Sequence, residues 1–151
     1  MLKKVFVLLF LLLIISGCGY VAVYKGVVNF NYKILVSEHT GDRDMINLIN
    51  TRLKKYSEIK SDKNFIIKID TIYQKNIIAK DTAGKATDYQ IKVTSNFNIK
   101  SEVINKIIKI NETFNVKAMD NKFEEQRYDT IIKNNIANTI VKRIILQLSR
   151  N

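Results

Sequence analysis

The chain has 151 residues, of which 46% are hydrophobic and 26% charged, and its formal net charge is +11 at pH 7. This length favours one domain, and this composition excludes an intrinsically disordered chain. The positive surplus favours anionic partners such as nucleic acid, phosphorylated lipid or an acidic protein lumen, although a genome rich in Lys, Ile and Asn codons explains single lysines equally well.

The first seventeen residues have the three parts of a secretory signal peptide. A positive start at Met1–Lys4 precedes an apolar stretch at Val5–Ile15, which is shorter than the roughly 20 residues of a membrane-spanning helix. Ser16 and Gly17 are small residues that precede Cys18, and this run resembles the bacterial lipobox, in which cleavage leaves a lipid-bearing cysteine. A lone cysteine cannot form an intramolecular disulfide and makes a poor metal site.

We therefore expect residues 1–17 to be a signal peptide that is removed, residues 18–29 a lipid-anchored tether, and residues 30–151 a single α+β domain. Cys18 would carry diacylglycerol and an N-acyl chain, and we expect no other cofactor and no metal. Several acyl chains hold a protein stably at a membrane without a spanning helix. Gly19 stands where many inner-membrane lipoproteins have aspartate, which favours the periplasmic side of the outer membrane.

The first part of the domain carries a strand signal and then a helix signal. Asn31–Ser37 is a short run rich in strand formers. Apolar residues then recur at helical spacing over residues 42–56, and either Asp42 or Asp44 is suited to cap the helix N-terminus. The sequence therefore predicts a strand followed by an amphipathic helix.

Three strands and a long helix follow. Phe65–Lys80 has apolar residues on both faces, residues 80–90 form a hairpin turn in which Gly84 supplies backbone freedom, and Tyr89–Lys100 alternates clearly between apolar and polar side chains. The fourth strand covers about residues 106–118, and its inward side chains are expected to be Ile108, Ile110, Phe114 and Val116.

The last helix is predicted from about Phe123 to Ser149. Isoleucine and leucine recur at every fourth position, flanked by further apolar residues, so the expected apolar face comprises Ile131, Ile132, Ile136, Ile140, Val141, Ile144, Ile145 and Leu148. The order of elements predicts a β-α-β-β-β-α sandwich, in which two helices pack on one face of a four-stranded mixed sheet. The helical crossover predicts that the first strand is parallel to its partner, and the later strands should form an antiparallel meander.

Catalytic chemistry has little support in the sequence. His39 is the one histidine, and a polar loop before a helix explains it without catalysis. The carboxylates of Asp81, Asp88, Glu112 and Asp120 are scattered, with no pairing evident from the sequence. No nucleophile elbow, P-loop or dinucleotide fingerprint occurs. We therefore expect no enzyme, and nucleic acid is not an expected partner because the chain would be anchored outside the cytoplasm.

Two turn regions hold candidate cations for an anionic partner, namely Lys80 and Lys85 in one region and Lys117, Lys122 and Arg127 in the other. An ammonium or guanidinium group there can pair with lipid phosphate. Solvated lysines at turns are the plainer explanation for each residue taken separately.

Three segments resemble the LptE (RlpB) family of lipopolysaccharide-assembly lipoproteins. They are "SGCGY" at residues 16–20, "AKDTAGKATDYQIKVTSNFNI" at 79–99 and "DNKFEEQRYDTIIKNNIANTIVKRIILQL" at 120–148. The lipobox alone is weak, whereas the hairpin followed by an alternating strand is more specific. The chain departs from many members after the cysteine, where it has "GYVAVYKG", and its hairpin around Gly84 looks shorter.

The resemblance implies a non-catalytic function. Members of the family plug the lumen of the LptD β-barrel, assist its assembly and help insert lipopolysaccharide into the outer leaflet. By position, it implies that Lys85, Lys122 and Arg127 contact lipopolysaccharide. The alternatives are a generic envelope scaffold lipoprotein and a periplasmic lipid-binding carrier module. A carrier would need a sizeable apolar cavity.

Overall fold

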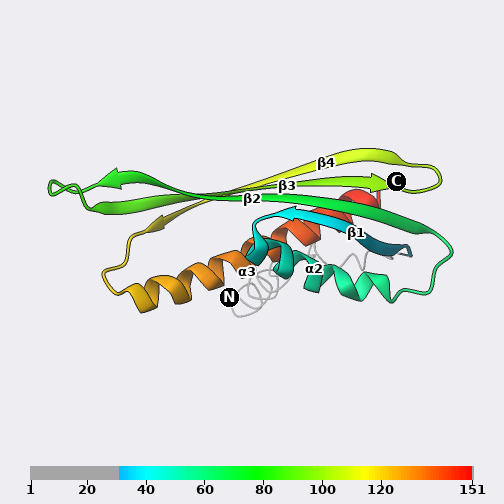
Figure 1. The fold of residues 1–151 in the computed structure, drawn as a ribbon, viewed down its shortest axis with the longest axis horizontal. Helices are drawn as coiled ribbons and strands as arrows, with labels where there is room; N and C mark the ends of the chain where they lie inside the picture. Colours follow the sequence, from blue (N-terminus) through cyan, green and yellow to red (C-terminus); the bar gives the residue numbers. More distant parts are fainter. Residues whose placement is uncertain (1–30, 151) are drawn as a thin grey trace, which may run out of the picture.

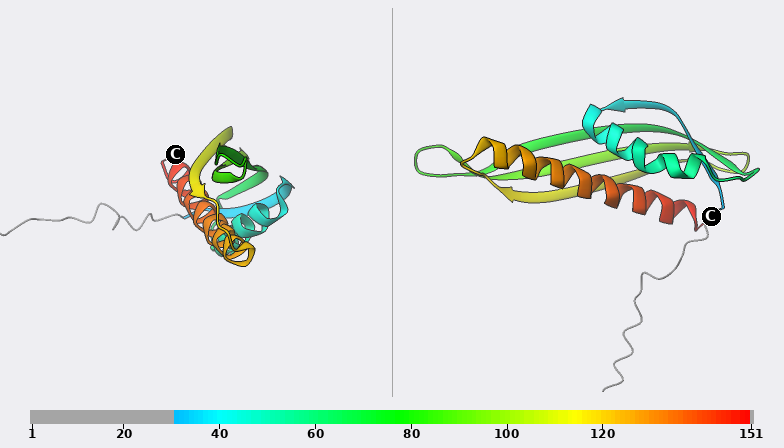
Figure 2. Two further views of the ribbon diagram at one scale, coloured as in Figure 1. Left: turned by 90° about the vertical axis from the view of Figure 1, so that its left-hand side faces the viewer. Right: turned by 90° about the horizontal axis from the view of Figure 1, so that it is seen from below.

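The structure is a computed structural model that describes residues 31–150, so the predicted signal peptide, Cys18 and the tether lie outside the described residues. The elements in chain order are β1 (Lys33–Gly41), α2 (Arg43–Ser57), β2 (Asn64–Lys80), β3 (Ala86–Lys100), β4 (Asn105–Lys117) and α3 (Lys122–Leu148). The strands form one sheet in the order β1-β2-β3-β4, and both helices cover the same face of it (Figures 1 and 2). The predicted α+β sandwich is confirmed.

The strand directions also follow the prediction. β1 pairs with β2 in parallel because α2 carries the chain back across the sheet, and β2, β3 and β4 form an antiparallel meander. The predicted end of the first strand at residue 37 is wrong. β1 continues past a bulge near Ser37 as far as Gly41, because its pairing with β2 extends to the Gly41–Thr71 register pair. His39 therefore lies in a strand and not in a loop.

The molecule has two unlike halves along its length. β1 pairs with β2 only as far as Thr71, whereas β2 continues to Lys80, so residues 72–80 have only β3 beside them. The half that contains the β2–β3 hairpin consists of β2, β3, the end of β4 and the beginning of α3 (Figure 1). The other half has all four strands and both helices. The chain enters the described domain in this second half, at residue 31.

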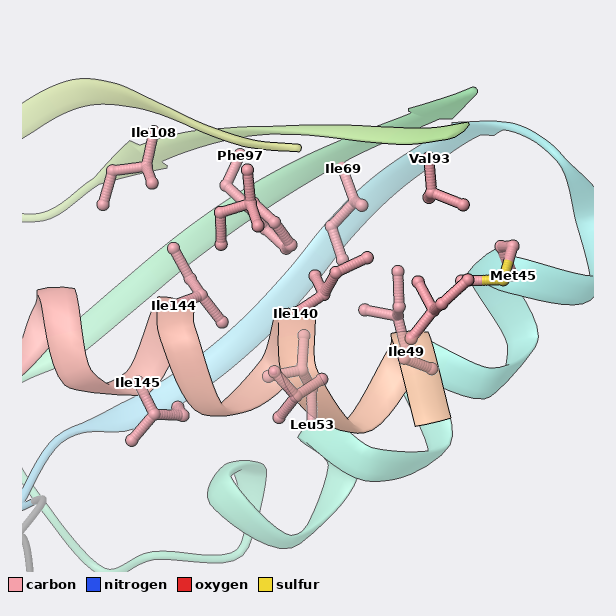
Figure 3. Close-up of a cluster of buried hydrophobic side chains, with 14 of the residues drawn as sticks. Met45, Ile49, Leu53, Ile69, Val93, Phe97, Ile108, Ile140, Ile144 and Ile145 are labelled. Atoms are coloured by element: carbon pink, nitrogen blue, oxygen red, sulfur yellow. The ribbon is translucent and has the colours of Figure 1, made fainter. Parts of the chain in front are cut away.

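The hydrophobic core lies between the sheet and the two helices (Figure 3). The alternation predicted for β3 is confirmed, since Ile91, Val93, Phe97 and Ile99 are all fully buried. The four-residue row of α3 is also buried, with Ile136, Ile140, Ile144 and Leu148 at 0% exposure. Fully burying such a side chain contributes about 1.5–3 kcal/mol, so this layer is the main source of stability.

Two predicted inward residues are partly exposed. Phe114 retains 37% of its accessible surface because it pairs with Ile91 in the half of the sheet that only α3 covers. Ile131 retains 47%, and helix geometry explains this. Ile131 is nine positions before Ile140, which is about half a turn out of phase at 100° per residue.

Polar contacts fix the helices to each other and to the sheet. Asp42 caps α2, because its side chain accepts a hydrogen bond of 2.9 Å from the Met45 backbone N–H. The Arg52 guanidinium of α2 donates to the side-chain oxygens of Asn138 at 2.6 Å and Asn134 at 2.8 Å in α3. This bidentate contact sets how the two helices lie side by side.

Two of the carboxylates that seemed scattered in the sequence have partners. Glu112 of β4 is nearly buried, and its Oε1 lies 2.8 Å from Nη1 of Arg143 in α3, in an ion pair whose direction departs from good hydrogen-bond geometry. Asp120 pairs with Lys85. These partners are basic side chains, and the sequence alone did not reveal them. Both pairs join segments that only the fold brings together.

Candidate functional site

The β2–β3 hairpin is held by its own backbone and by Asp81. The Asp81 carboxylate accepts hydrogen bonds of 2.9 Å from the backbone N–H groups of both Ala83 and Lys85. Gly84 has a φ of 81°, a conformation that glycine adopts without strain. The turn is shorter than the predicted 80–90, since β3 already begins at Ala86.

The hairpin meets the connection between β4 and α3. Nζ of Lys85 lies 2.6 Å from Oδ1 of Asp120, and the Ala118 backbone N–H donates to the Thr87 carbonyl at 2.7 Å. Asn121 then caps α3, accepting from the Phe123 N–H at 2.9 Å. The structure therefore brings together the two turn regions that the sequence analysis selected.

The three residues predicted to contact lipopolysaccharide differ in whether a carboxylate already engages them. The ammonium of Lys85 is engaged by Asp120, and this raises the pKa of Lys85 and lowers that of Asp120, mainly through their hydrogen bond. Lys122 is exposed in the first turn of α3, and Arg127 is exposed further along the helix. Within residues 31–150 neither Lys122 nor Arg127 is paired with a carboxylate.

The hairpin end has no surplus of positive charge. Residues 80–90 and 117–127 together contain five basic and five acidic side chains. An anion would therefore be attracted by individual cations and not by the field of the whole end. Lys122 and Arg127 are available as they stand, whereas Lys85 would have to exchange Asp120 for the anion.

An open groove of about 380 Å³ lies between the start of α3 and β2. Its lining comprises Lys75, Lys122, Glu125, Gln126, Asp129 and Thr130. Lys75 of β2 is already engaged by its neighbours, since its Nζ lies 2.8 Å from Oε1 of Glu125 and 4.7 Å from the centre of the Tyr89 ring. Of the two lysines that line the groove, Lys122 is the one without an ion pair within residues 31–150.

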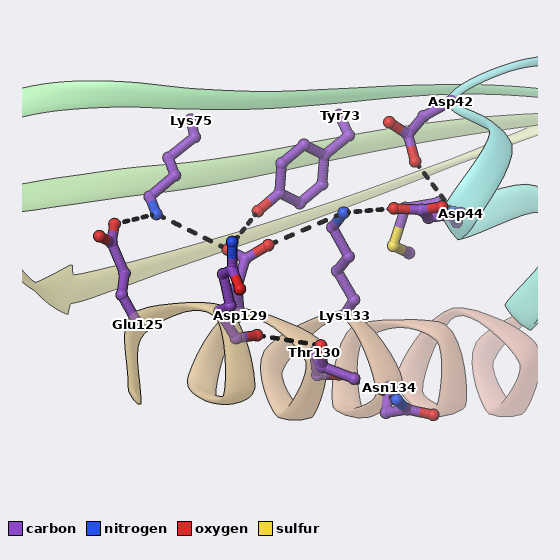
Figure 4. Close-up of polar contacts among 11 residues, drawn as sticks. Asp42, Asp44, Tyr73, Lys75, Glu125, Asp129, Thr130, Lys133 and Asn134 are labelled. Atoms are coloured by element: carbon purple, nitrogen blue, oxygen red, sulfur yellow. Dashed lines mark hydrogen bonds and ion pairs between the residues drawn. The ribbon is translucent and has the colours of Figure 1, made fainter. Parts of the chain in front are cut away.

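A network of charged groups continues from this groove toward α2 (Figure 4). Asp129 accepts a 3.0 Å hydrogen bond from the Tyr73 hydroxyl, and its carboxylate lies 3.7 Å from Nζ of Lys133. Lys133 also donates to Asp44 of α2 at 2.8 Å. Burial raises the pKa of Tyr73, and the charge of Asp129 adds to this effect.

Burial by itself would lower the pKa of Lys133, but the hydrogen bond to Asp44 and the nearby carboxylates outweigh it, and the net shift is upward. The same contact lowers the pKa of Asp44. Sequence reasoning missed this network. The signal was present in the i, i+4 spacing of Glu125, Asp129 and Lys133, which places all three on one helix face.

The face of the sheet away from the helices carries rows of amide and hydroxyl groups. Thr94 donates to Asn111 at 2.9 Å, and Asp70 accepts from Thr40 at 2.9 Å and from Asn96 at 3.3 Å. The same face also has apolar side chains that are partly or largely exposed, namely Leu35, Ile66, Ile72, Ile78 and Ile107. Such a mixture of polar and apolar groups is the composition of a typical protein–protein interface.

The outer face is hollowed beside β1. This open depression of about 490 Å³ has His39, Asp70, Asn96 and Ile107 in its lining. Its charged groups are already satisfied, since Glu38 pairs with Lys68 at 2.7 Å and Asp70 has two hydrogen-bond donors. Among the described residues, no group of three His, Cys, Asp or Glu side chains could hold a metal ion. The part of the chain seen here also contains no helix long and apolar enough to span a membrane.

Two helices on one face of a four-stranded sheet is the fold of this domain, and solved structures of bacterial lipoproteins share it. No protein-family model matches the sequence, and no curated protein matches it. Solved structures do match. The chain has the fold of the rare lipoprotein B structures, so the resemblance to the RlpB family is confirmed at the level of the fold.

The structural match covers most of each chain at low sequence identity. Rare lipoprotein B from Shewanella oneidensis superposes with a TM-score of 0.56 at 10% identity, over 79% of this chain and 96% of its own. A minor lipoprotein from Acinetobacter baumannii gives 0.51 at 12% identity, over 78% and 92%. Lipoprotein B from Nitrosomonas europaea gives 0.52 at 14% identity, over 78% and 84%.

Proposed function

We propose that this protein is an outer-membrane lipoprotein, anchored through acyl chains on Cys18, that plugs an LptD-like β-barrel, helps to assemble it and assists lipopolysaccharide insertion into the outer leaflet. The observation that carries the proposal is the rare lipoprotein B fold, found in a chain whose lipobox separately predicts a lipoprotein. The role is structural and not catalytic.

The packing of the domain suits a plug better than a carrier. A carrier of lipid would need an apolar cavity beneath the helices. That space is filled by fully buried side chains, among them Phe97, Ile140 and Met45 (Figure 3). The hollows of about 490 and 380 Å³ are open and lie outside this core. A filled domain of this kind presents groups to a partner and does not enclose a ligand.

The outer sheet face supplies what the polar lumen of a barrel would contact. Rows of Thr and Asn side chains offer both donors and acceptors, and lysines on the same face, such as Lys92 and Lys109, add charge. Hydrogen bonds between such groups and a polar wall replace those made to water, so burial of this face costs little. A generic envelope scaffold shares the anchor and the fold, and differs only in its partner.

Lipopolysaccharide phosphates would be bound at the hairpin end. Lys122 and Arg127 are exposed and unpaired within residues 31–150, and Lys85 would join them after exchanging its partner Asp120. Lys122→Glu should lower binding of purified lipopolysaccharide several-fold while the domain stays folded. Lys142→Glu is the matched control, because it reverses another exposed α3 lysine far from this end. Equal losses in both variants would contradict the site.

The partner is tested by isolating the tagged full-length protein from a Gram-negative envelope in mild detergent, followed by mass spectrometry. We expect one large outer-membrane barrel protein in a stable complex. Recovery of the protein alone, or with a periplasmic assembly, would favour the scaffold. Metabolic labelling with a fatty acid, compared between the native chain and Cys18→Ser, tests the anchor separately.

A further inference from the structure

The positive charge of the domain is concentrated at the end where the chain enters it. We define the basic end as residues 31–33, 54–64, 100–106 and Arg150. These segments comprise the start of β1, the end of α2 and the loop after it, the β3–β4 turn and the C-terminal end of the chain, and they lie together opposite the β2–β3 hairpin (Figures 1 and 2). Backbone contacts join them: the Lys33 N–H donates to the Lys63 carbonyl at 2.9 Å, and the Ser61 hydroxyl donates to the Asn31 carbonyl at 2.8 Å.

The two ends differ in charge. The basic end has eight basic and three acidic side chains, a surplus of five, whereas the hairpin end is balanced at five of each. Within residues 31–150 the cations of the basic end form no ion pair, whereas two cations of the other half, Lys75 and Lys85, pair with Glu125 and Asp120. Most of these cations are exposed, including Lys54, Lys55, Lys60, Lys63 and Lys100.

An apolar side chain projects from the middle of this charge. Val103 stands in the β3–β4 turn and is 88% exposed, the highest value among the exposed large hydrophobic side chains of residues 31–150. The turn holds its shape through the Ser101 N–H, which donates to the Ile104 carbonyl at 2.8 Å. Lys100 and Lys106 flank the turn on the two strands. An apolar tip between lysines is the arrangement that inserts into a headgroup layer while cations contact the phosphates.

We propose that the basic end binds the anionic phospholipid headgroups of the leaflet to which the chain is anchored. This inference rests on the proposed anchoring through Cys18. Thirteen residue steps separate the anchor at residue 18 from residue 31, and they can reach no more than roughly 45 Å. Residue 31 lies in the basic end, so the anchor would hold this end, and not the hairpin, against the membrane surface. β2 alone, with 17 residues, extends roughly 55 Å away from it.

The lipid contact thus gives the domain a fixed orientation. The anchor by itself would keep residue 31 near the surface but would not fix the angle at which the domain stands on it. The basic end would fix this angle, because each lysine near an anionic surface raises the binding constant roughly fivefold. The hairpin end, with Lys122 and Arg127, would then point away from the leaflet and toward the interior of a partner.

The test uses the full-length chain with Cys18→Ser, which removes the one native cysteine, so that a single new cysteine can be introduced at a selected position. One version carries Val103→Cys and the other Ala83→Cys at the hairpin turn, each labelled with an environment-sensitive fluorophore. Vesicles are of phosphatidylcholine alone or mixed with phosphatidylglycerol. We expect the label at position 103 to report an apolar environment only with phosphatidylglycerol, and to lose that signal as salt rises. The label at position 83 should not respond to phosphatidylglycerol.

Two matched pairs of lysine variants show which end of the domain supplies the charge that binds the vesicles. Lys100→Gln with Lys106→Gln should lower the phosphatidylglycerol-dependent binding about 25-fold. Lys80→Gln with Lys117→Gln, at the opposite end of the sheet, should leave it unchanged. Equal responses of the two labels, equal losses in the two lysine pairs, or removal of the signal by soluble glycerophosphate at constant ionic strength would overturn the proposal. Failure to find a barrel partner would not change the outcome of the vesicle experiment. The proposed barrel partner and the proposed phospholipid contact can therefore be refuted independently.

Discussion

Nζ of Lys85 and Oδ1 of Asp120 lie 2.6 Å apart and join the tip of the β2–β3 hairpin to the loop before α3. Both side chains are largely exposed, so water and salt screen the pair. The contact nevertheless occupies a cation that the resemblance assigns to lipopolysaccharide. An anionic lipid that contacts Lys85 must therefore compete with Asp120.

This relationship predicts a gain of binding. Asp120→Asn removes the competing charge and should strengthen lipopolysaccharide binding by roughly two- to fivefold at low salt, since exposed ion pairs are weak. Asp62→Asn, which removes an exposed carboxylate at the opposite end, is the control and should leave the hairpin site unchanged. Titration of both variants with purified lipopolysaccharide checks this. Unchanged or weaker binding in Asp120→Asn would show that Lys85 does not contact the lipid.

The two glycines with positive φ should differ sharply in their tolerance of alanine. Gly41 has a φ of 104°, and an added Cβ would lie 2.0 Å from the Thr71 carbonyl oxygen, at the point where β1 ends against β2. Gly84 has a φ of 81° in the hairpin turn, with nothing within 4 Å of such a Cβ. Gly84→Ala should cost about 1 kcal/mol of unfolding free energy, and Gly41→Ala at least about 2 kcal/mol more. Urea denaturation of both variants measures the difference, and equal costs would contradict the Gly41 geometry.

A buried hydroxyl pair should behave as one unit. The Thr71 and Ser95 hydroxyl oxygens lie 3.0 Å apart across β2 and β3, and both residues are 0% exposed. Thr71→Val should destabilise the fold by about 1–3 kcal/mol, because it leaves the Ser95 hydroxyl buried without this partner. Thr71→Val combined with Ser95→Ala should cost less than the sum of the single changes. A double-mutant cycle measures this. If the loss of unfolding free energy in the double variant equals the sum of the losses in the two single variants, the hydroxyls do not interact.

The contact between Asp44 and Lys133 predicts a dependence on acid. The pKa of Asp44 is lowered below its ordinary value of 3.8, mainly by the hydrogen bond from Lys133. A carboxylate with a lowered folded pKa stabilises the fold above its unfolded pKa, and this contribution is lost as pH falls through the folded pKa. The thermal midpoint of the native chain should therefore fall more steeply below about pH 4 than that of Asp44→Asn. Asp62→Asn, which removes a carboxylate without an ion pair in residues 31–150, should keep the native slope. Parallel curves for the native chain and Asp44→Asn would rule out the linkage.

Periodicity predicted the fold well where packing follows local pattern. The alternation of Ile91, Val93, Phe97 and Ile99 and the four-residue row of α3 both define faces that any packed sheet and helix would bury. The prediction was wrong for Phe114, because the alternation of β4 does not reveal how far a helix extends over that strand. It was also wrong for the end of β1, which depends on its register with β2.

The candidate site was predictable only in part. The turn regions themselves are evident from Gly84 and from the polar entry to α3, but that the two regions meet is seen only in the structure. The partner of Lys85 was not predictable, because Asp120 is 35 residues away and meets it only once β2, β3 and β4 are paired. The same holds for the basic end, whose basic side chains come from four separate segments and form one surface only in the fold.

The most direct test of the plug asks how many faces of the domain are enclosed by one partner. A photo-crosslinking residue is placed at Lys92, on the outer face of β3, or at Lys142, on the exposed side of α3, and cells are irradiated before the envelope is analysed. These two positions lie on opposite faces of the sandwich. A domain inside a barrel should give crosslinks from both positions to the same large outer-membrane barrel protein. Crosslinks from only one of the two positions, or to different proteins from each, would contradict the plug and favour a scaffold that docks through a single face.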